Sequence, residues 1–212
     1  LLAASRCFRL ALNSRSASCS RCTAVAACIR KKASLRASTS AADACAFWED
    51  MCYSGGPLLS PAHFRQYLVP QYRRITEQLR AHGCEVAWVD CDGDISGLVG
   101  HWLEAGVNTM FPLEIGTWKE GTDPVGLRAE YGRDLRLMGG FDKHILAAGP
   151  AEIAAEVDRL TPLVEEGGYI GFADHRVPPD VPLANYLFYL EQVREKWGRG
   201  VNLKPMMLEQ PA

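Results

Sequence analysis

The 212-residue sequence lacks the features that mark several large classes of protein. Its formal net charge is −2 and its pI is near 6.2, so it has no basic excess for binding nucleic acid or an anionic membrane. No run approaches the roughly 20 apolar residues of a membrane helix. No glycine-rich fingerprint or phosphate-binding loop follows a predicted strand, which disfavours nucleotide binding. We therefore expect a soluble, cytoplasmic protein with no nucleic-acid or membrane partner.

Acidic residues are missing from the first 40 positions, which contain eight of the 23 Lys and Arg and none of the 25 Asp and Glu. A basic, Ser-rich and acid-poor segment is typical of an organellar transit segment. A frame-shifted or chimeric translation has the same composition, and we favour it because residues 1–40 show no sustained amphipathic period. The sequence thus predicts three parts: 1–43, disordered or not native to the fold; 44–200, the folded domain; and 201–212, a tail.

Cysteine spacing indicates neither a metal site nor a disulfide framework. Cys19 and Cys22 form one C-x-x-C pair, whereas a structural zinc site needs a second pair or nearby histidines. The cysteines of the acidic part are scattered, and no secretory signal precedes them: Cys45, Cys52, Cys84 and Cys91. We interpret these four as reduced thiols in a cytosol-like compartment.

Past residue 43, short apolar runs alternate with helix-period segments, the pattern of βα units on a parallel sheet. The predicted strands are Glu85–Cys91, Val107–Leu113, Leu135–Gly140 and Gly168–Ala173. The predicted helices are one from Ser60-Pro61 to Gly83 with a kink at Pro70, and Ile95–Ala105, Val125–Tyr131, Ala151–Glu166 and Leu183–Trp197. The fold class is therefore α/β, a TIM (β/α)8-type barrel with only its C-terminal half, about four βα units, present. An open doubly wound sheet is the alternative.

Ionisable residues follow every predicted strand, where functional side chains gather in this architecture. They are Asp90, Asp92 and Asp94; Glu114; Asp142 and Lys143; and Asp174, His175 and Arg176. Strand alternation places Asp90 and Asp92 on one face and Cys91 on the other. Together with Glu114 and His175, these acids can hold a divalent metal, bind a cationic substrate or act as acid and base. Capping of the following helix is the structural alternative.

His175 is the strongest histidine candidate because it lies between Asp174 and Arg176 where a buried strand ends. A carboxylate beside an imidazole raises its basicity and suits proton transfer or ligation. Glu49, Asp50 and Tyr53 follow what resembles another strand-to-loop junction, although no clear strand pattern precedes them. We include these three as candidate site residues.

Several ordered motifs resemble the uroporphyrinogen decarboxylase (URO-D) superfamily over about residues 44–198. They are Glu49–Tyr53 (EDMCY) with Leu59-Ser60-Pro61, Val89–Ile95 (VDCDGDI), Leu137–Lys143 (LMGGFDK), Gly167–Ile170 and Asp174–Asn185 (DHRVPPDVPLAN). The resemblance covers the C-terminal half of that family's barrel. It implies either zinc-dependent methyl transfer involving a corrinoid protein or cofactor-free decarboxylation of a tetrapyrrole.

Residues 90–95 (DCDGDI) and the PLE strand end at Glu114 resemble the methyltransferase-like branch most closely. The resemblance thus implies a fragment that transfers a methyl group from a small molecule toward a corrinoid or related acceptor. In this sequence Asp90 and Asp92 replace the His and Cys ligands of the corrinoid enzymes. His175 stands where the decarboxylases have a Gly-His-Gly turn, so uroporphyrinogen decarboxylase activity in porphyrin biosynthesis is the alternative.

The resemblance also implies roles for the candidate residues. His175, Asp90 and Asp92 are the expected catalytic residues, and with Glu114 they are the expected ligands of a divalent metal such as zinc. The residues expected to bind a small-molecule or tetrapyrrole substrate are Glu49, Asp50, Tyr53, Glu114, Asp142 and Lys143. A third interpretation is a non-catalytic remnant. Because a half barrel exposes strand edges and an uncovered face, we expect a homodimer or association with a missing N-terminal half.

Overall fold

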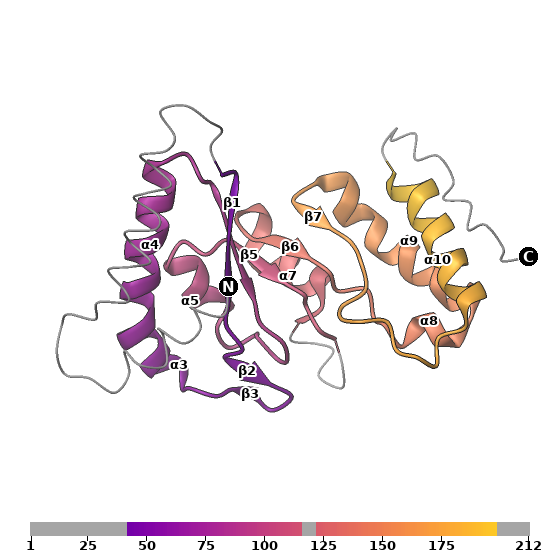
Figure 1. The fold of residues 1–212 in the computed structure, drawn as a ribbon, viewed down its shortest axis with the longest axis horizontal. Coiled ribbons are helices and arrows are strands. Elements are labelled where there is room, and N and C mark those ends of the chain that lie inside the picture. Colours follow the sequence, from indigo (N-terminus) through magenta and orange to yellow (C-terminus); the bar gives the residue numbers. More distant parts are fainter. Residues whose placement is uncertain (1–41, 116–121, 199–212) are drawn as a thin grey trace, which may run out of the picture.

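The computed structural model describes residues 42–115 and 122–198, which fold around a five-stranded parallel sheet (Figure 1). Its strands lie in the order β1 (Ala44–Trp48), β4 (Val86–Asp90), β5 (Thr109–Phe111), β6 (Arg136–Met138) and β7 (Tyr169–Ile170). A separate antiparallel hairpin, β2 (Cys52–Tyr53) and β3 (Gly56–Pro57), follows β1. Spatial neighbours in the large sheet therefore follow one another along the chain.

Helices connect the successive strands of the sheet, and the last helix follows the last strand. They are α3 (Pro61–His63), a π-helical turn (Phe64–Leu68), α4 (Val69–Ala81), α5 (Val99–Glu104), α7 (Pro124–Tyr131), a 3-10 turn (Gly132–Asp134), α8 (Ile145–Ala148), α9 (Pro150–Glu166) and α10 (Leu183–Trp197). The first begins at Ser60-Pro61 as predicted, and Ser60 accepts a hydrogen bond from the His63 amide. Helix α7 begins one residue before its predicted start, at Pro124, and Asp123 accepts a hydrogen bond from the Gly126 amide. No described helix is both long and apolar enough to span a membrane.

The predicted fold class is confirmed, because sequential parallel strands joined by helices are the arrangement of part of a (β/α)8 barrel. A doubly wound sheet would instead reverse its strand order. All four predicted strands form, although each is shorter than predicted. A fifth strand, Ala44–Trp48, was not predicted, and it pairs in parallel with Val86–Asp90. The predicted segments 1–43 and 201–212, including Cys19 and Cys22, lie outside the described residues except for positions 42 and 43.

Two helix predictions need correction. The helix expected over Ile95–Ala105 begins only at Val99, because Asp94 first forms a turn in which its carboxylate accepts hydrogen bonds from the Ser96 amide and hydroxyl. The irregularity expected at Pro70 lies just before it, as the π-helical turn Phe64–Leu68.

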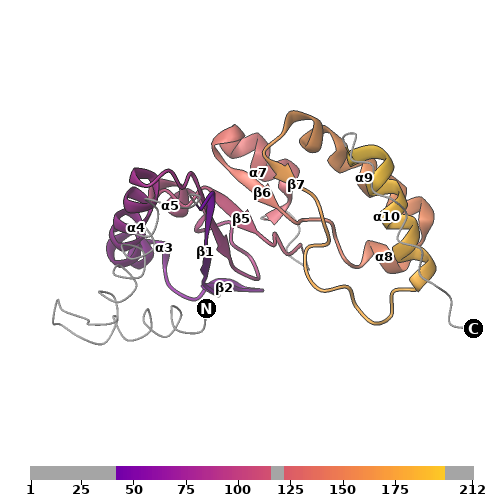
Figure 2. The ribbon, with the colours of Figure 1, turned by 45° about the horizontal axis from the view of Figure 1, so that its top comes forward.

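The two faces of the sheet differ in burial. On β4, Ala87 and Val89 are buried toward the helices, whereas Trp88 and Asp90 on the opposite face are only partly buried. Figure 2 shows helices α4, α5, α7 and α9 along one side of the strands. The opposite face has a row of aromatic rings, in which Phe111 lies 5.1 Å from Trp88 and 5.7 Å from Phe172 between ring centroids. The carboxyl ends of the strands lie at one edge of this face.

Candidate functional site

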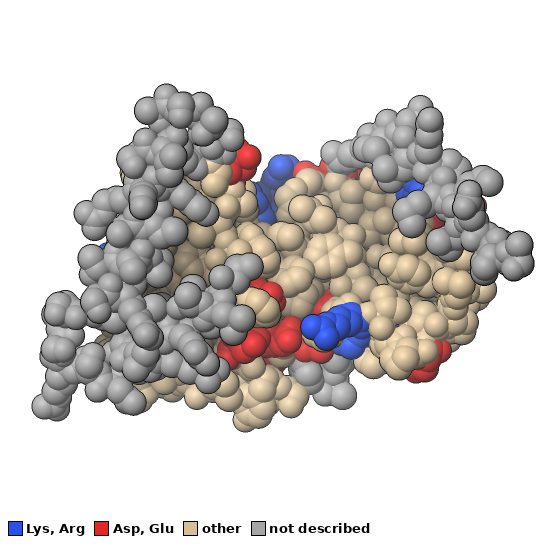
Figure 3. Space-filling model, viewed as in Figure 1, with Lys and Arg blue, Asp and Glu red and all other residues tan. Residues whose placement is uncertain are grey.

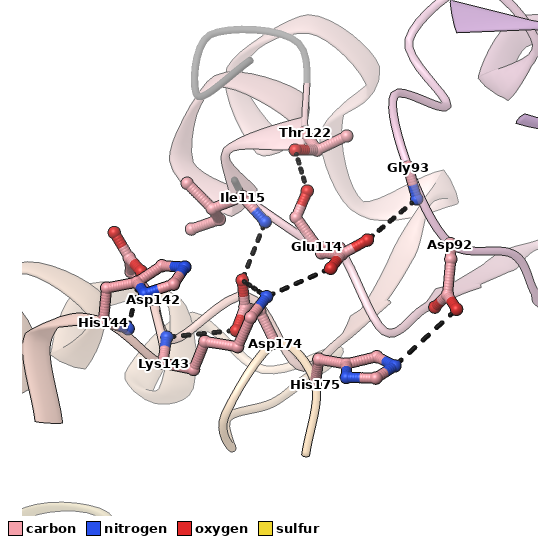
Figure 4. Close-up of polar contacts among 10 residues, drawn as sticks. All are labelled: Asp92, Gly93, Glu114, Ile115, Thr122, Asp142, Lys143, His144, Asp174 and His175. Atoms are coloured by element: carbon pink, nitrogen blue, oxygen red, sulfur yellow. Dashed lines mark hydrogen bonds and ion pairs between the residues drawn. The ribbon is translucent and has the colours of Figure 1, made fainter. Parts of the chain in front are cut away.

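The carboxyl ends of four strands bring the predicted polar residues together. A parallel bridge between Phe141 and Ala173 continues the pairing of β6 and β7 past their ends. The Asp174 amide then donates to the Phe141 carbonyl at 2.8 Å. This pairing places the loop that contains Lys143 directly against the loop that contains Asp174 and His175 (Figure 4). The site therefore arises from backbone pairing beyond the regular strands.

Lys143 is the centre of a buried network. Its Nζ lies 3.1 Å from Glu114 Oε1 and 3.5 Å from Asp174 Oδ2, and its side chain is 11% exposed. Burial alone lowers the pKa of Lys143, but the hydrogen bonds and charges of Glu114 and Asp174 outweigh it, so the net shift is upward. Lys143 is therefore a buried ammonium between two carboxylates.

Asp174 is the most deeply buried acid of the site, with a side chain that is fully inaccessible to solvent. Its two oxygens accept hydrogen bonds from the Ile115 amide at 2.8 Å and the Lys143 amide at 3.0 Å. Burial raises the pKa of Asp174, while these backbone hydrogen bonds and the Lys143 charge act in the opposite direction. Asp174 thus joins the ends of three strands, a role that we did not predict from the sequence.

Glu114 links this network to the loop after β4. Its second carboxylate oxygen accepts a hydrogen bond from the Gly93 amide at 3.1 Å. Gly93 has φ +80°, and a Cβ there would lie 2.6 Å from backbone atoms of Tyr53, so only glycine fits under the β2–β3 hairpin. Gly93 was not among the predicted site residues, although its place within DCDGDI was the available signal.

Asp92 and His175 form a second, more open pair. His175 Nε2 lies 3.6 Å from Asp92 Oδ2, and the side chains are 37% and 45% exposed, respectively. The sequence indicated Asp174 as the partner of His175. The structure corrects this, because Asp174 turns toward Ile115 and Lys143 while His175 points toward Asp92 (Figure 4). Consecutive residues leaving a strand point to opposite sides, so one cannot assist the other.

Asp90 is an acid that titrates near neutral pH. Burial, with the negative charges of Asp92 and Asp50, raises the pKa of Asp90 to about 6, against an opposing effect of His175. Burial also raises the pKa of Asp92, where His175 again opposes the shift. A carboxyl group with such a pKa can both give and accept a proton under physiological conditions. In Figure 3, acidic side chains gather at the lower centre of the molecule, beside basic ones.

The four predicted metal ligands, Asp90, Asp92, Glu114 and His175, do not assemble into a metal site. The carboxylate of Glu114 is bound by Lys143 and Gly93, so an ammonium already occupies the place where a cation would bind it. Across residues 42–115 and 122–198, no group of three or more His, Cys, Asp and Glu side chains is arranged to hold a metal ion. The residues present therefore do not fit the predicted zinc.

The remaining predicted site residues have different environments. Asp142 is buried and its carboxylate accepts a hydrogen bond from the His144 amide at 2.9 Å, which is a structural role in the turn. Asp50 and Tyr53 are exposed next to the loop after β4. The Glu49 amide donates to the Asp90 carbonyl at 2.9 Å, which places this residue beside the same strand end.

Glu49 provides a test of the electrostatics at this edge. Burial and the Asp50 charge raise the pKa of Glu49 from 4.5 to about 7. The folded state therefore binds more protons than the unfolded state between these values, and stability falls as pH rises through this window. We expect Glu49→Gln to remove part of this fall and to raise the free energy of unfolding by about 2 kcal/mol at pH 8.

Urea unfolding of Glu49→Gln at pH 4 to 8 checks this expectation, with the exposed Glu85→Gln as the matched control. Glu85→Gln is expected to keep the wild-type pH dependence. If Glu49→Gln also keeps it, the carboxyl group of Glu49 is not held protonated by its surroundings.

The sequential parallel sheet, its connecting helices and the polar strand ends define an α/β protein of the barrel class. The chain belongs to the uroporphyrinogen decarboxylase (URO-D) family, whose family model matches residues 13–196. This confirms the resemblance inferred from the motifs. The match extends N-terminally beyond the residues on which that resemblance was based.

Curated relatives and one solved structure are similar to parts of this chain. A uroporphyrinogen decarboxylase from Gloeobacter violaceus is 29% identical over 136 residues, covering 64% of this chain and 38% of the relative. A second, from Maricaulis maris, is 26% identical over 134 residues, covering 63% and 37%. A solved methyltransferase from Methanosarcina mazei is 20% identical with a TM-score of 0.49, covering 73% of this chain and 42% of that chain. The chain thus spans well under half the length of these curated relatives.

Proposed function

We propose that this chain forms part of an enzyme site that transfers a proton to a small carboxylated molecule during decarboxylation. The observation that carries this proposal is the open Asp92–His175 pair beside Asp90, whose pKa is raised to about 6. Curated relatives named uroporphyrinogen decarboxylase support this reaction class. When protonated, His175 offers a positive charge to a substrate carboxylate.

The reaction places defined demands on these groups. When CO2 leaves, the bond between carbon and the carboxylate breaks and its electron pair stays on the substrate carbon. A nearby acid must then supply a proton to that carbon. Asp90 suits this task because burial raises its pKa to about 6. Burial also raises the pKa of Asp92, which lies two residues further along the chain. We assign the donation of this proton to these two acids, and the binding of the substrate carboxylate to His175.

Lys143 and Glu114 have a different role in this proposal from the substrate binding that the sequence suggested. Each is bonded to the other, and Lys143 also contacts Asp174. We propose that they are positioning residues, which hold the loops after β4 and β5 in place through the Glu114–Gly93 hydrogen bond. Their opposite charges act on Asp92 in opposite directions, because Glu114 raises the pKa of Asp92 and Lys143 lowers it.

The aromatic side chains on the sheet face beside Asp90 indicate a class of substrate. In the sheet, Asp90 lies in register between Trp48 and Phe111, and the aromatic row continues through Trp88 and Phe172. Flat aromatic surfaces bind flat, ring-containing molecules through large contact areas. A carboxylated tetrapyrrole combines such rings with carboxylates for His175, and we propose it as the substrate.

Methyl transfer from a small molecule toward a corrinoid is the second candidate. The resemblance of residues 90–95 to the methyltransferase-like branch favours it. A metal for this reaction would need ligands other than the four predicted ones, because Glu114 is already bound to Lys143. The two candidates differ in whether CO2 or a methyl group leaves the substrate.

We also propose that the working form contains a partner, either a second copy or the other half of a barrel. Among the described strands, β1 and β7 each have one neighbour, so each leaves an open edge. Trp48 on β1 is 57% exposed and Ile170 on β7 is 60% exposed. Open parallel edges with exposed apolar side chains favour association. A chain that has no catalytic activity of its own and needs this partner corresponds to the remnant interpretation.

Asp92→Asn tests the proposed reaction. Because positioned acid–base groups contribute about 100-fold or more, we expect the rate of CO2 release from uroporphyrinogen to fall by about 100-fold. Asp180→Asn, which changes an exposed loop acid, is the matched control and should keep the wild-type rate. Equal rates for the two variants would rule out Asp92 as a catalytic acid.

A further inference from the structure

Two cysteines from distant parts of the sequence lie against each other beneath the β2–β3 hairpin. Cys52, in β2, and Cys91, just after β4, belong to the same buried core cluster, and interaction with Cys91 raises the pKa of the Cys52 thiol. Cys52 is 5% exposed and Cys91 is 1% exposed. The proposed proton transfer uses neither thiol, so the contact calls for a separate explanation.

The backbone holds this pair in place from both sides. The Glu49 amide donates to the Asp90 carbonyl at 2.9 Å on one side, and the Asp94 amide donates to the Tyr53 carbonyl at 3.1 Å on the other. Residues 49–53 therefore run alongside residues 90–94, with the two cysteines between the two hydrogen bonds. The close packing of Gly93 on the Tyr53 backbone confirms that these segments are in contact.

We propose that Cys52 and Cys91 are a redox modification site, which forms a reversible disulfide between the hairpin and the loop that contains Asp92. A disulfide needs side chains that face each other across a short gap, and paired neighbouring segments provide this. The described structure has both cysteines as free thiols. The disulfide would link Cys91, the residue before Asp92, to the hairpin and so restrict movement of the loop that contains Asp92.

The oxidation balances with hydrogen peroxide as the oxidant. One thiolate attacks a peroxide oxygen, the O–O bond breaks, and a sulfenic acid and one water form. The second thiol then attacks the sulfenic sulfur and releases a second water, which leaves the disulfide. Two electrons pass from the two sulfurs to the peroxide. A dithiol such as dithiothreitol returns them and restores both cysteines.

The environment of the Cys52 and Cys91 thiols predicts that peroxide oxidises them slowly. The interaction with Cys91, together with burial, raises the pKa of the Cys52 thiol, so little thiolate is present at neutral pH. The covering hairpin has strands of two residues each, and Tyr53 at its end is 52% exposed. Local opening of so short a hairpin gives peroxide access to the pair.

The sequence allows a clean mass-spectrometric test. Trypsin releases Cys52 in residues 37–65, together with Cys45, and Cys91 in residues 81–119, together with Cys84. In the full chain with Cys45→Ser and Cys84→Ser, a disulfide joining these two peptides can only be Cys52–Cys91. After hydrogen peroxide treatment we expect the linked pair, two hydrogen masses lighter than the separate peptides and separated again by dithiothreitol.

Adding Cys52→Ser to the same background is expected to abolish the linked pair. Retention of the reduced peptides, or separate oxidation of each thiol to sulfinic acid, would overturn the proposal. If the double serine variant fails to fold, fragmentation of the linked peptides from the wild-type chain locates the bonded sulfurs directly. A bond through Cys45 or Cys84 in that measurement would also overturn it. None of these results depends on catalytic activity.

Discussion

Lys143→Met is expected to lower the free energy of unfolding by about 3–5 kcal/mol, because it leaves two carboxylates without their shared cation. Glu114 and Asp174 both contact the Lys143 ammonium, and the Asp174 side chain is completely buried. Methionine fills a similar volume, so the loss reports the missing charge rather than a cavity. Urea unfolding at pH 7 measures the effect.

The control for this variant is Lys196→Met, which removes a lysine paired with the exposed Asp158. Surface ion pairs contribute about 0–1 kcal/mol, so this variant should unfold almost as the wild type does. Combining Lys143→Met with Glu114→Gln is expected to recover part of the loss, because one uncompensated charge is then removed. Equal stability of the two lysine variants would contradict the role of Lys143 as the centre of a buried network.

Gly139→Ala is the second large effect, with an expected loss of about 3 kcal/mol or more. Gly139 follows β6 with φ +97°, and a Cβ there would lie 2.0 Å from the Pro112 carbonyl oxygen. That carbonyl cannot easily move away, because the Gly140 amide donates to it at 3.0 Å. The substitution therefore forces apart the strand ends that lead to Glu114 and Lys143.

Gly83→Ala separates this clash from simple backbone strain. Gly83 has a similar φ of +79°, but no other atom lies within 4 Å of the position that its Cβ would take. The left-handed conformation alone costs about 1–2 kcal/mol for a residue with a Cβ. We expect calorimetry to show a much larger fall in melting temperature for Gly139→Ala than for Gly83→Ala. Similar falls would mean that the loops after β5 and β6 are not packed as described.

The parts of the fold that follow from local signals were predicted well. The helix Leu183–Trp197 has its predicted bounds, and Ala151–Glu166 differs by one residue. Ile153, Val157 and Leu160 are buried on one stripe of α9, as their spacing predicts. The positions of the strand ends were also predictable, because buried apolar runs that stop at Asp, Glu or Gly mark them.

The features that depend on tertiary pairing were not predicted. Strand Ala44–Trp48 has no β-branched residues and becomes a strand by pairing with Val86–Asp90. The contact of Lys143 with Glu114, instead of substrate, depends on which loops meet across the sheet edge. Asp174 is next to His175 in the sequence, but their side chains point in different directions. His175 therefore pairs with Asp92. The predicted metal site failed because the Glu114 carboxylate contacts the Lys143 ammonium instead of being open to a metal ion.

The central claim is that the open edge of this sheet works by proton transfer through its own acids. The most direct test is CO2 release from uroporphyrinogen by the full 212-residue chain, with and without a metal chelator. We predict that CO2 is released and that the rate is unchanged by the chelator. Absence of CO2 release by the chain alone would show that the proposed partner is required. Release that the chelator stops and added zinc restores would contradict the account.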